Sequence, residues 1–278
     1  MITDNKVFNG VLESHSLNEG LPTINDFNYY DDRTYITNSM LGKLKESPHT
    51  LREYLAGGGG ISTTALSMGD ALHKGMLEPD KYRDNVVVWN RSMFPEPDKT
   101  LRTKVNKEWM DNFKKENEGM CILEDNEWML VEAMLNSLKS KPDAMECLKD
   151  AEYEQISLAF INGVPVKSKG DIRKINGKKL IDIKSTSDVS LENFKESCDK
   201  YGYYRQAGMY CKMFGAEEFA FLVVEKKAPY RVAIYEVSKE KIKEGWEETL
   251  ELIEQYKHYF LDDPLQLRID ESVIKGIL

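Results

Sequence analysis

Two aspartates and a lysine are spaced so that their side chains could meet at one point. Asp171 is followed eleven residues later by Asp182, Lys184 lies two residues further on, and Asn176-Gly177 lies between the aspartates. Asn-Gly is a strong signal for a tight hairpin turn, so we expect the two aspartates on paired strands. Residues two apart in a strand share a face, which places Lys184 beside Asp182.

Such a pair of carboxylates is unfavourable unless a cation lies between them, because like charges on neighbouring strands repel. A Mg²⁺ or Mn²⁺ ion would remove the repulsion, since both prefer oxygen ligands and keep bound water. The backbone carbonyl of Ile183 could add another oxygen. Lys184 could position an attacking water, help to deprotonate it or stabilise charge on a phosphate, which is the chemistry of phosphodiester hydrolysis.

The competing interpretation is a solvated salt bridge of Asp171, Asp182 and Lys184 across the hairpin. Short motifs of this kind arise often by chance. The hairpin context and the residues around the motif favour the metal site.

The motif lies in a segment with the two-residue periodicity of β-strands. From Glu152 onward, alternation and the turns at Asn162-Gly163 and Asn176-Gly177 predict a three-strand antiparallel meander. The expected strands are 154–160, 164–175 and 178–184. Beyond the meander we expect a helix over 190–213, strands over 219–225 and 230–237, and a last helix over 239–259.

The first half of the chain is predicted to be mainly helical. A helix is expected over 38–55, with Asn38 or Ser39 as its cap and a kink or break at Ser47-Pro48. An amphipathic helix is expected over 125–139. The proline-containing stretch 79–105 is expected to be loop.

The order of the candidate residues resembles a known family. That order is Gly69-x-x-x-His73, Glu154, Lys167-x-Lys169-x-Asp171, Asp182-x-Lys184-Ser-Thr and Gln206-x-x-x-Tyr210. It is similar to the RecE-type (exonuclease VIII-like) branch of the RecB-like PD-(D/E)XK exonucleases. The flanking stretches ALHKGMLEPDKY, KYGYYRQAGMY and FLVVEKKAPYRVAIYEV also resemble that branch, and the likeness covers roughly residues 28 to 258.

The resemblance implies roles for individual residues. It makes Asp171, Asp182 and Lys184 catalytic, with both aspartates as metal ligands and His73 as a ligand or a residue close to the metal. Glu154 matches the acidic residue at the head of the first strand, although Glu152 is an alternative. Gln206 and Tyr210, one helical turn apart, could hold Lys184 or the scissile phosphate.

The net charge of −9 argues at first against a nucleic-acid partner, because Lys and Arg supply most non-specific affinity. The stretch from Pro165 to Lys184 is nevertheless basic, which is compatible with a local DNA-binding groove. Its candidate DNA-binding residues are Lys167, Lys169 and Arg173. Lys169 stands where an arginine is common in the family, so it keeps the charge but loses bidentate phosphate geometry.

The resemblance implies an α/β (α+β) fold with the restriction-endonuclease-like core, in which helices flank a central mixed β-sheet. We expect one nuclease domain over residues 1–278. Within it, 1–150 would be the mainly helical elaboration with the first motif, 151–260 the catalytic sheet core and 261–278 a tail.

Composition excludes several other classes of protein. Cys121, Cys147, Cys198 and Cys211 form no CxxC pair, which argues against a disulfide framework, a zinc site or an iron–sulfur cluster. No apolar run approaches the length of a membrane span, and the start MITDNKVFNG has no signal or transit pattern. We therefore expect a soluble cytoplasmic protein with no membrane partner.

The function implied by the resemblance is a Mg²⁺- or Mn²⁺-dependent exodeoxyribonuclease. It would digest linear double-stranded DNA from its 5′ ends, as a homo-oligomeric ring of three or four copies, and leave 3′ single strands for an annealing protein in phage or prophage recombination. One alternative is an endonuclease or a single-strand or flap nuclease with the same metal site. The other, from a different class, is a catalytically silent DNA-binding protein.

Overall fold

A mixed β-sheet forms the centre of the protein. The structure is a computed structural model that describes residues 12–13, 23–25, 28–57, 64–263 and 266–270. The strand order is β1-β4-β5-β6-β7-β8, with β6 and β7 parallel and the other neighbours antiparallel. The strands are β1 (Leu12–Glu13), β4 (Ala151–Ile161), β5 (Val164–Lys174), β6 (Lys179–Thr186), β7 (Glu218–Glu225) and β8 (Val232–Glu236). The predicted α/β class with a central mixed sheet is confirmed.

The predicted meander is present, and its two hairpins differ in length. β4 and β5 pair along nearly their whole length around Asn162-Gly163, where both residues have the positive φ of a two-residue hairpin turn. β5 and β6 form only the pairs Ile172↔Ile181 and Arg173↔Leu180 beside their turn. The two strands therefore separate just where the predicted motif begins.

The helices of the first half differ in detail from the prediction. The expected helix over 38–55 is two helices, α1 (Asn38–Glu46) and α2 (Pro48–Leu55), because Ser47 has extended backbone and caps α2 ahead of its proline. The cap of α1 is Thr37, one residue before the expected Asn38 or Ser39. The other helices here are α3 (Thr64–Leu77), α5 (Lys104–Glu116), α6 (Asp125–Lys139) and α7 (Pro142–Leu148).

The prediction of loop over 79–105 was wrong. The stretch contains α4 (Pro79–Asn85), β2 (Val86–Trp89), a 3₁₀ turn at Arg91–Met93 and the start of α5. β2 pairs in parallel with β3 (Cys121–Glu124) and forms a small second sheet. The error arose because Pro79 was taken as a breaker, whereas proline at the first position of a helix is favourable.

The helices of the second half pack on the sheet and on one another. The helix expected over 190–213 is α8 (Leu191–Tyr201) followed by α9 (Tyr203–Phe214), since Gly202 between them has a φ of 67°. α10 (Lys239–Tyr256) continues as a π turn at Lys257–Leu261, and α11 (Leu267–Asp270) follows. α10 crosses α9 closely, because a Cβ on Gly208 or Gly245 would overlap the backbone of the other helix.

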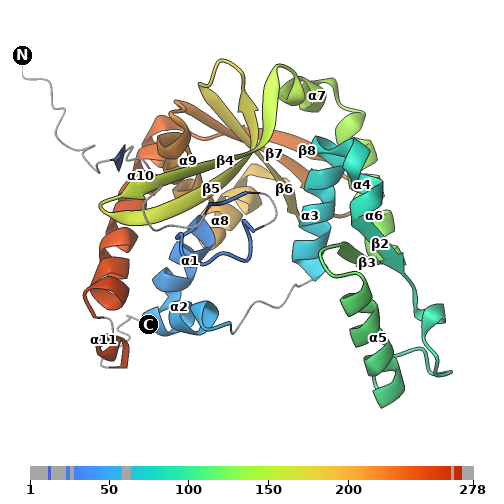
Figure 1. Ribbon diagram of the computed structural model, residues 1–278. Coiled ribbons are helices and arrows are strands. Elements are labelled where there is room, and N and C mark those ends of the chain that lie inside the picture. The colour runs from blue at the N-terminus through green and yellow to red at the C-terminus, as the bar shows by residue number, and fades with distance from the viewer. Residues whose placement is uncertain (1–11, 14–22, 26–27, 58–63, 264–265, 271–278) are drawn as a thin grey trace, which may run out of the picture.

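Helices cover both faces of the sheet. On one face, Leu72 of α3 and Val131 of α6 join a core cluster with Ile183 and Leu222 of the sheet. On the other face, Phe194 of α8 and Ala207 of α9 pack with strand residues that include Phe221. Figure 1 shows the result as an arch, with α1, α2 and α10 on one side and α3, α5 and α6 on the other.

No helix in the described ranges is long and apolar enough to cross a membrane. The division of the chain at residues 150 and 260 stays a prediction. Part of the expected tail, residues 264–265 and 271–278, lies outside the described residues.

Candidate active site

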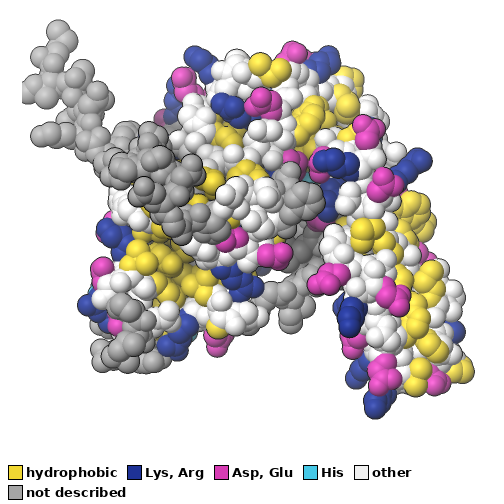
Figure 2. Space-filling model, viewed as in Figure 1, with side chains coloured by type: hydrophobic (Ala, Val, Ile, Leu, Met, Phe, Trp, Pro, Cys, Tyr) yellow, Lys and Arg dark blue, Asp and Glu magenta, His cyan; other side chains and the backbone are white. Residues whose placement is uncertain are grey.

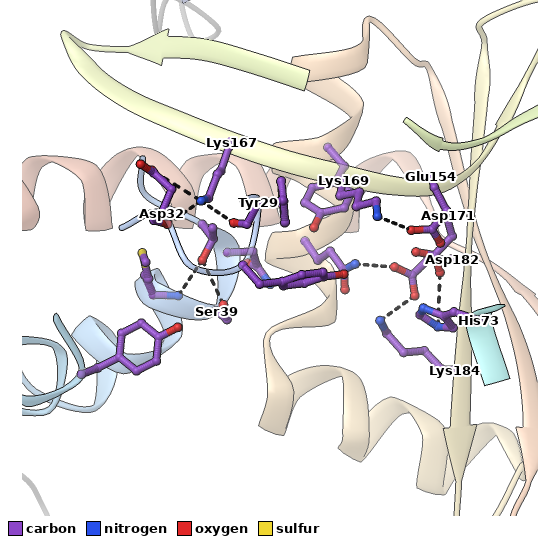
Figure 3. A pocket seen from close by; sticks show the side chains of 17 residues that line it. Tyr29, Asp32, Ser39, His73, Glu154, Lys167, Lys169, Asp171, Asp182 and Lys184 are labelled. Atoms are coloured by element: carbon purple, nitrogen blue, oxygen red, sulfur yellow. Dashed lines mark hydrogen bonds and ion pairs between the residues drawn. The ribbon is translucent and has the colours of Figure 1, made fainter. Parts of the chain in front are cut away.

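The candidate residues gather in one cavity of about 280 Å³, where the sheet meets α1, α3 and α9. Figure 3 shows them converging from separate elements. Of the residues expected to be catalytic or to bind metal through their side chains, all line it: His73, Glu154, Asp171, Asp182, Lys184, Gln206 and Tyr210.

Three carboxylates form a row across the strands. Continuing the β4–β5 register places Glu154 opposite Asp171, and continuing the β5–β6 register places Asp171 opposite Asp182. Neither position is a regular ladder pair, and Glu154 has a φ of 52°, which is unusual for a residue other than glycine. Local departures from regular sheet geometry thus accompany the row.

Asp182 is held by two neighbours. Lys184 Nζ lies 2.6 Å from Asp182 Oδ2, and the side-chain amide of Gln206 donates to Asp182 Oδ1. Burial alone would lower the pKa of Lys184, but the carboxylates of Asp182 and Asp171 outweigh it and raise that pKa above its ordinary value. Lys184 therefore remains an ammonium group at neutral pH.

His73 reaches the row from α3. Its Nε2 atom lies 2.8 Å from the carbonyl oxygen of Ile183 and 3.5 Å from Asp171 Oδ2. The backbone N–H of Ile183 donates to the same Asp171 oxygen at 2.8 Å. The backbone N–H and C=O of Ile183 thus join the aspartate and the histidine, and the role of this carbonyl as a metal ligand stays a prediction.

The residues present fit a divalent cation. One potential ligand atom from each of His73, Glu154 and Asp171 lies within 4.8 Å of the others. Burial, and then the charge of Asp182, raise the pKa of Asp171 to about 7, and a bound cation would favour the ionised carboxylate against both effects. Carboxylates suit Mg²⁺ and Mn²⁺, and the imidazole nitrogen widens the fit to transition-metal ions. Asp182 is outside this group of three, so its role as a ligand stays a prediction.

The two glutamates at the head of β4 have different environments. Glu154 lines the cavity, where its carboxylate lies 2.7 Å from Lys169 Nζ. Glu152 is half exposed and forms an ion pair of 3.2 Å with Arg173, and neither residue is among those that line the cavity. The structure therefore brings Glu154, and not Glu152, to the site.

Lys167 does not fit its expected role in DNA binding. Its side chain is 1% exposed, and its ammonium group donates to the carbonyls of Tyr29 at 2.6 Å and Asp32 at 2.5 Å. The strand alternation placed Lys167 correctly on the face of Lys169 and Asp171. It could not show that the segment around Tyr29 covers this lysine.

Gln206 and Tyr210 lie one turn apart on α9 and both face the cavity, as expected. Gln206 contacts Asp182 rather than Lys184. Burial, with a smaller contribution from Tyr29, raises the pKa of Tyr210 far above its ordinary value. Tyr210 is therefore a neutral phenol that can donate a hydrogen bond.

Sequence reasoning missed one wall of the cavity. Thr37, Asn38 and Ser39 at the start of α1 line it, together with Tyr29, Tyr30, Asp32 and Tyr54. The signal for α1 was its capping pattern, which we interpreted only as a helix start. Arg205 holds this wall in place, because it donates to Asn38 Oδ1 at 2.9 Å and to Glu248 Oε1 at 2.8 Å.

Comparison with known proteins agrees with this fold. Residues 37–262 match the family model described as a PDDEXK-like domain of unknown function (DUF3799), and the chain belongs to this family. A candidate exonuclease from Eubacterium rectale, known from its crystal structure, is similar with a TM-score of 0.60 and 16% identity, over 92% of this chain and 96% of that chain. At this identity, the likeness shows the shared fold.

A second solved structure is more distant. The phage-related exonuclease from Haemophilus somnus 129PT is 14% identical over 82% of this chain and 96% of that chain, with a TM-score of 0.34. That score supports no conclusion about this chain. A comparison with curated proteins gives no significant match.

The raised pKa of Asp171 predicts how stability depends on pH and metal. The folded protein keeps this proton up to about pH 7, whereas the ordinary value is 3.8, so the unfolded chain binds fewer protons between these values. In EDTA this group should make stability fall as pH rises through that window. Added Mn²⁺ competes with the proton, so it should raise Tm more at pH 8 than at pH 6.

Thermal unfolding with EDTA or Mn²⁺ across this pH range checks the prediction, and Asp171→Asn is the matched control. The variant should lose this contribution to the pH dependence and most of the shift caused by Mn²⁺. An equal Mn²⁺ shift in wild type and variant would contradict the assignment of Asp171 as a ligand.

Proposed function

We propose that the protein is a divalent-metal-dependent exodeoxyribonuclease that hydrolyses linear double-stranded DNA from its 5′ ends. One observation carries the proposal: a possible metal site of His73, Glu154 and Asp171 lies in the same cavity as the Asp182–Lys184 pair, in a PDDEXK-like chain. The exonuclease activity rests on the family resemblance, with support from the description of the Eubacterium rectale protein of the same fold.

The residues of the site have distinct roles in this proposal. His73, Glu154 and Asp171 would hold a Mg²⁺ or Mn²⁺ ion, with the Ile183 carbonyl and Asp182 as further candidate oxygens. Such an ion would supply a Lewis acid for the phosphate and lower the pKa of the attacking water.

In this proposal Lys184 acts as a cation, because its ammonium group lies 2.6 Å from Asp182 and the neighbouring carboxylates raise its pKa. Its ammonium group would stabilise the negative charge that develops on the phosphate oxygens. Asp182 positions Lys184, and Gln206 in turn positions Asp182. The neutral phenol of Tyr210 would donate a hydrogen bond to the phosphate.

The size of the cavity favours a strand end as the substrate. Its volume of about 280 Å³ is at the lower limit of ligand pockets, which span about 300–1,000 Å³. A duplex is wider than such a space, so in this proposal one strand leaves its partner before its phosphate reaches the row of carboxylates. Strand ends separate more easily than internal base pairs, which supports end-dependent digestion.

The proposed assembly is a ring of three or four copies around DNA, and an annealing protein would take the 3′ single strands. Lys and Arg are interspersed with Asp and Glu on the face shown in Figure 2, so retention by encirclement suits this face better than strong electrostatic attraction to DNA. Exposed apolar side chains near α5 and α6, Met93, Leu101, Val105 and Met129, would suit contacts between copies. A strict monomer in solution, with and without DNA, would contradict the ring.

The test uses a linear duplex with a distinguishable label at each 5′ and 3′ end, incubated with Mg²⁺, Mn²⁺ or EDTA. The proposal expects metal-dependent release of the 5′ labels, while a covalently closed circular duplex stays intact. Cutting of the circle would show an endonuclease. Binding of DNA without cleavage under any metal would show a catalytically silent DNA-binding protein.

A further inference from the structure

Tyr30 is an exposed aromatic side chain on the wall of the catalytic cavity. It is 68% exposed and yet lines the same cavity as Glu154 and Asp171. Tyr29, the residue before it, is only 6% exposed. The hydrolytic roles assigned above make no use of Tyr30.

The backbone on both sides of Tyr30 is fixed to the sheet. Lys167 of β5 donates to the carbonyl of Tyr29 and to that of Asp32, and Figure 3 shows these contacts. The N–H of Asp32 also donates to the carbonyl of Asn28 at 2.9 Å. The buried Lys167 therefore holds the turn that contains Tyr30. Its ammonium group is occupied by these contacts and is not exposed to solvent.

The ring of Tyr30 is also supported directly. The Tyr29 ring meets it edge-on, with centroids 5.1 Å apart and planes at 83°. Lys169 Nζ lies 5.7 Å from its centroid and also pairs with Glu154 of the candidate metal site. Tyr30 thus stands beside the row of carboxylates, and a platform held in place before binding loses little conformational entropy when a ligand stacks on it.

We propose that Tyr30 stacks on the nucleobase of the nucleotide whose phosphate enters the cavity, and that it selects an unpaired base at the strand end. This inference rests on the proposed nuclease function. Aromatic rings stack on any base, because every base has a π-face, so the contact would give little sequence preference. A base that is still paired offers this face only after it leaves the duplex, so Tyr30 would favour frayed ends.

The first test compares Tyr30→Ala with Tyr30→Phe in steady-state digestion. Loss of one stacked base should raise KM about tenfold in Tyr30→Ala, with kcat changed far less, whereas Tyr30→Phe should behave like the wild type. Trp128→Ala is the matched control, since Trp128 is an exposed aromatic that is not among the residues lining the cavity. An unchanged KM in Tyr30→Ala would overturn the inference.

The second test removes the base instead of the side chain. A duplex with an abasic nucleotide at the 5′ end should raise the KM of the wild type by a similar factor and that of Tyr30→Ala hardly at all. If the abasic nucleotide raises the KM of Tyr30→Ala by the same factor as that of the wild type, the two effects are independent. Tyr30 then does not contact that base, and the inference fails. If the wild type itself cleaves no DNA, the proposed function fails. That outcome is distinct from failure of the stacking inference, because it does not depend on any variant.

A third measurement does not depend on turnover. In EDTA, a duplex with 2-aminopurine as its terminal base should lose fluorescence on binding the wild type or Tyr30→Phe, because stacking quenches this base. Binding to Tyr30→Ala should leave most of the fluorescence. Equal quenching by all three proteins would contradict the stacking contact, even if digestion is confirmed.

Discussion

Asp182→Ala is expected to reduce DNA hydrolysis by at least about 10²–10³-fold, the usual loss when one preorganised donor to the transition state, here Lys184, is no longer in place. The substitution leaves Lys184 and Gln206 without the carboxylate that positions them. Binding of DNA should remain within a few-fold of the wild type, since Lys169 is untouched. Hydrolysis of a labelled duplex and a separate binding assay give the two quantities.

Two further variants make the result specific. Asp182→Asn keeps the shape of the side chain and can still bond Gln206, so it should fold normally and remain inactive. Glu152→Ala removes an acid that pairs with Arg173 and is not among the residues lining the cavity, so it should retain activity. Full activity in Asp182→Asn would show that the site has been assigned to the wrong carboxylates.

Gly245→Ala is expected to lower the free energy of unfolding by about 2–3 kcal/mol, towards the upper end of overpacking costs. A Cβ at this position would overlap the carbonyl of Tyr204, and backbone atoms cannot rotate away. The better helix propensity of alanine returns only about 1 kcal/mol. Urea denaturation should show a lower midpoint, and Tm should fall by several degrees.

Gly69→Ala is the matched control for this helix-packing prediction. Gly69 lies within α3, and a Cβ there would meet no atom within 4 Å. Alanine should therefore stabilise the protein by up to about 1 kcal/mol. If both variants change stability equally, the close crossing of α9 and α10 is not what requires glycine at 245.

The two hairpins of the candidate site could be predicted because their signals are local. Two Asn-Gly turns and a two-residue periodicity defined β4, β5 and β6, and the same alternation placed Asp171 and Asp182 together. The resemblance supplied His73, which no local pattern connects to the hairpins. The distance of 110 residues between His73 and its partner Ile183 explains why periodicity alone could not have found it.

What could not be predicted depends on contacts between distant segments. The turn at Tyr29 contacts Lys167 across 138 residues, so nothing local distinguishes this buried lysine from Lys169, the candidate DNA-binding residue two positions further on. Asn38 and Ser39 were interpreted as caps, although they also line the cavity. Proline was ambiguous for a different reason: the same residue type begins α4 and α7 and would break a helix elsewhere.

The positions of the three carboxylates depend on the register in which β4, β5 and β6 pair. Glu154, Asp171 and Asp182 are separated by 17 and 11 residues, and a slip of one residue in a strand would turn its side chains to the opposite face. A one-residue insertion or deletion within a strand of either hairpin would therefore turn a carboxylate away from the site without changing its sequence neighbours. We expect related chains to keep these two spacings. The segment over residues 90–120 should instead vary in length among them.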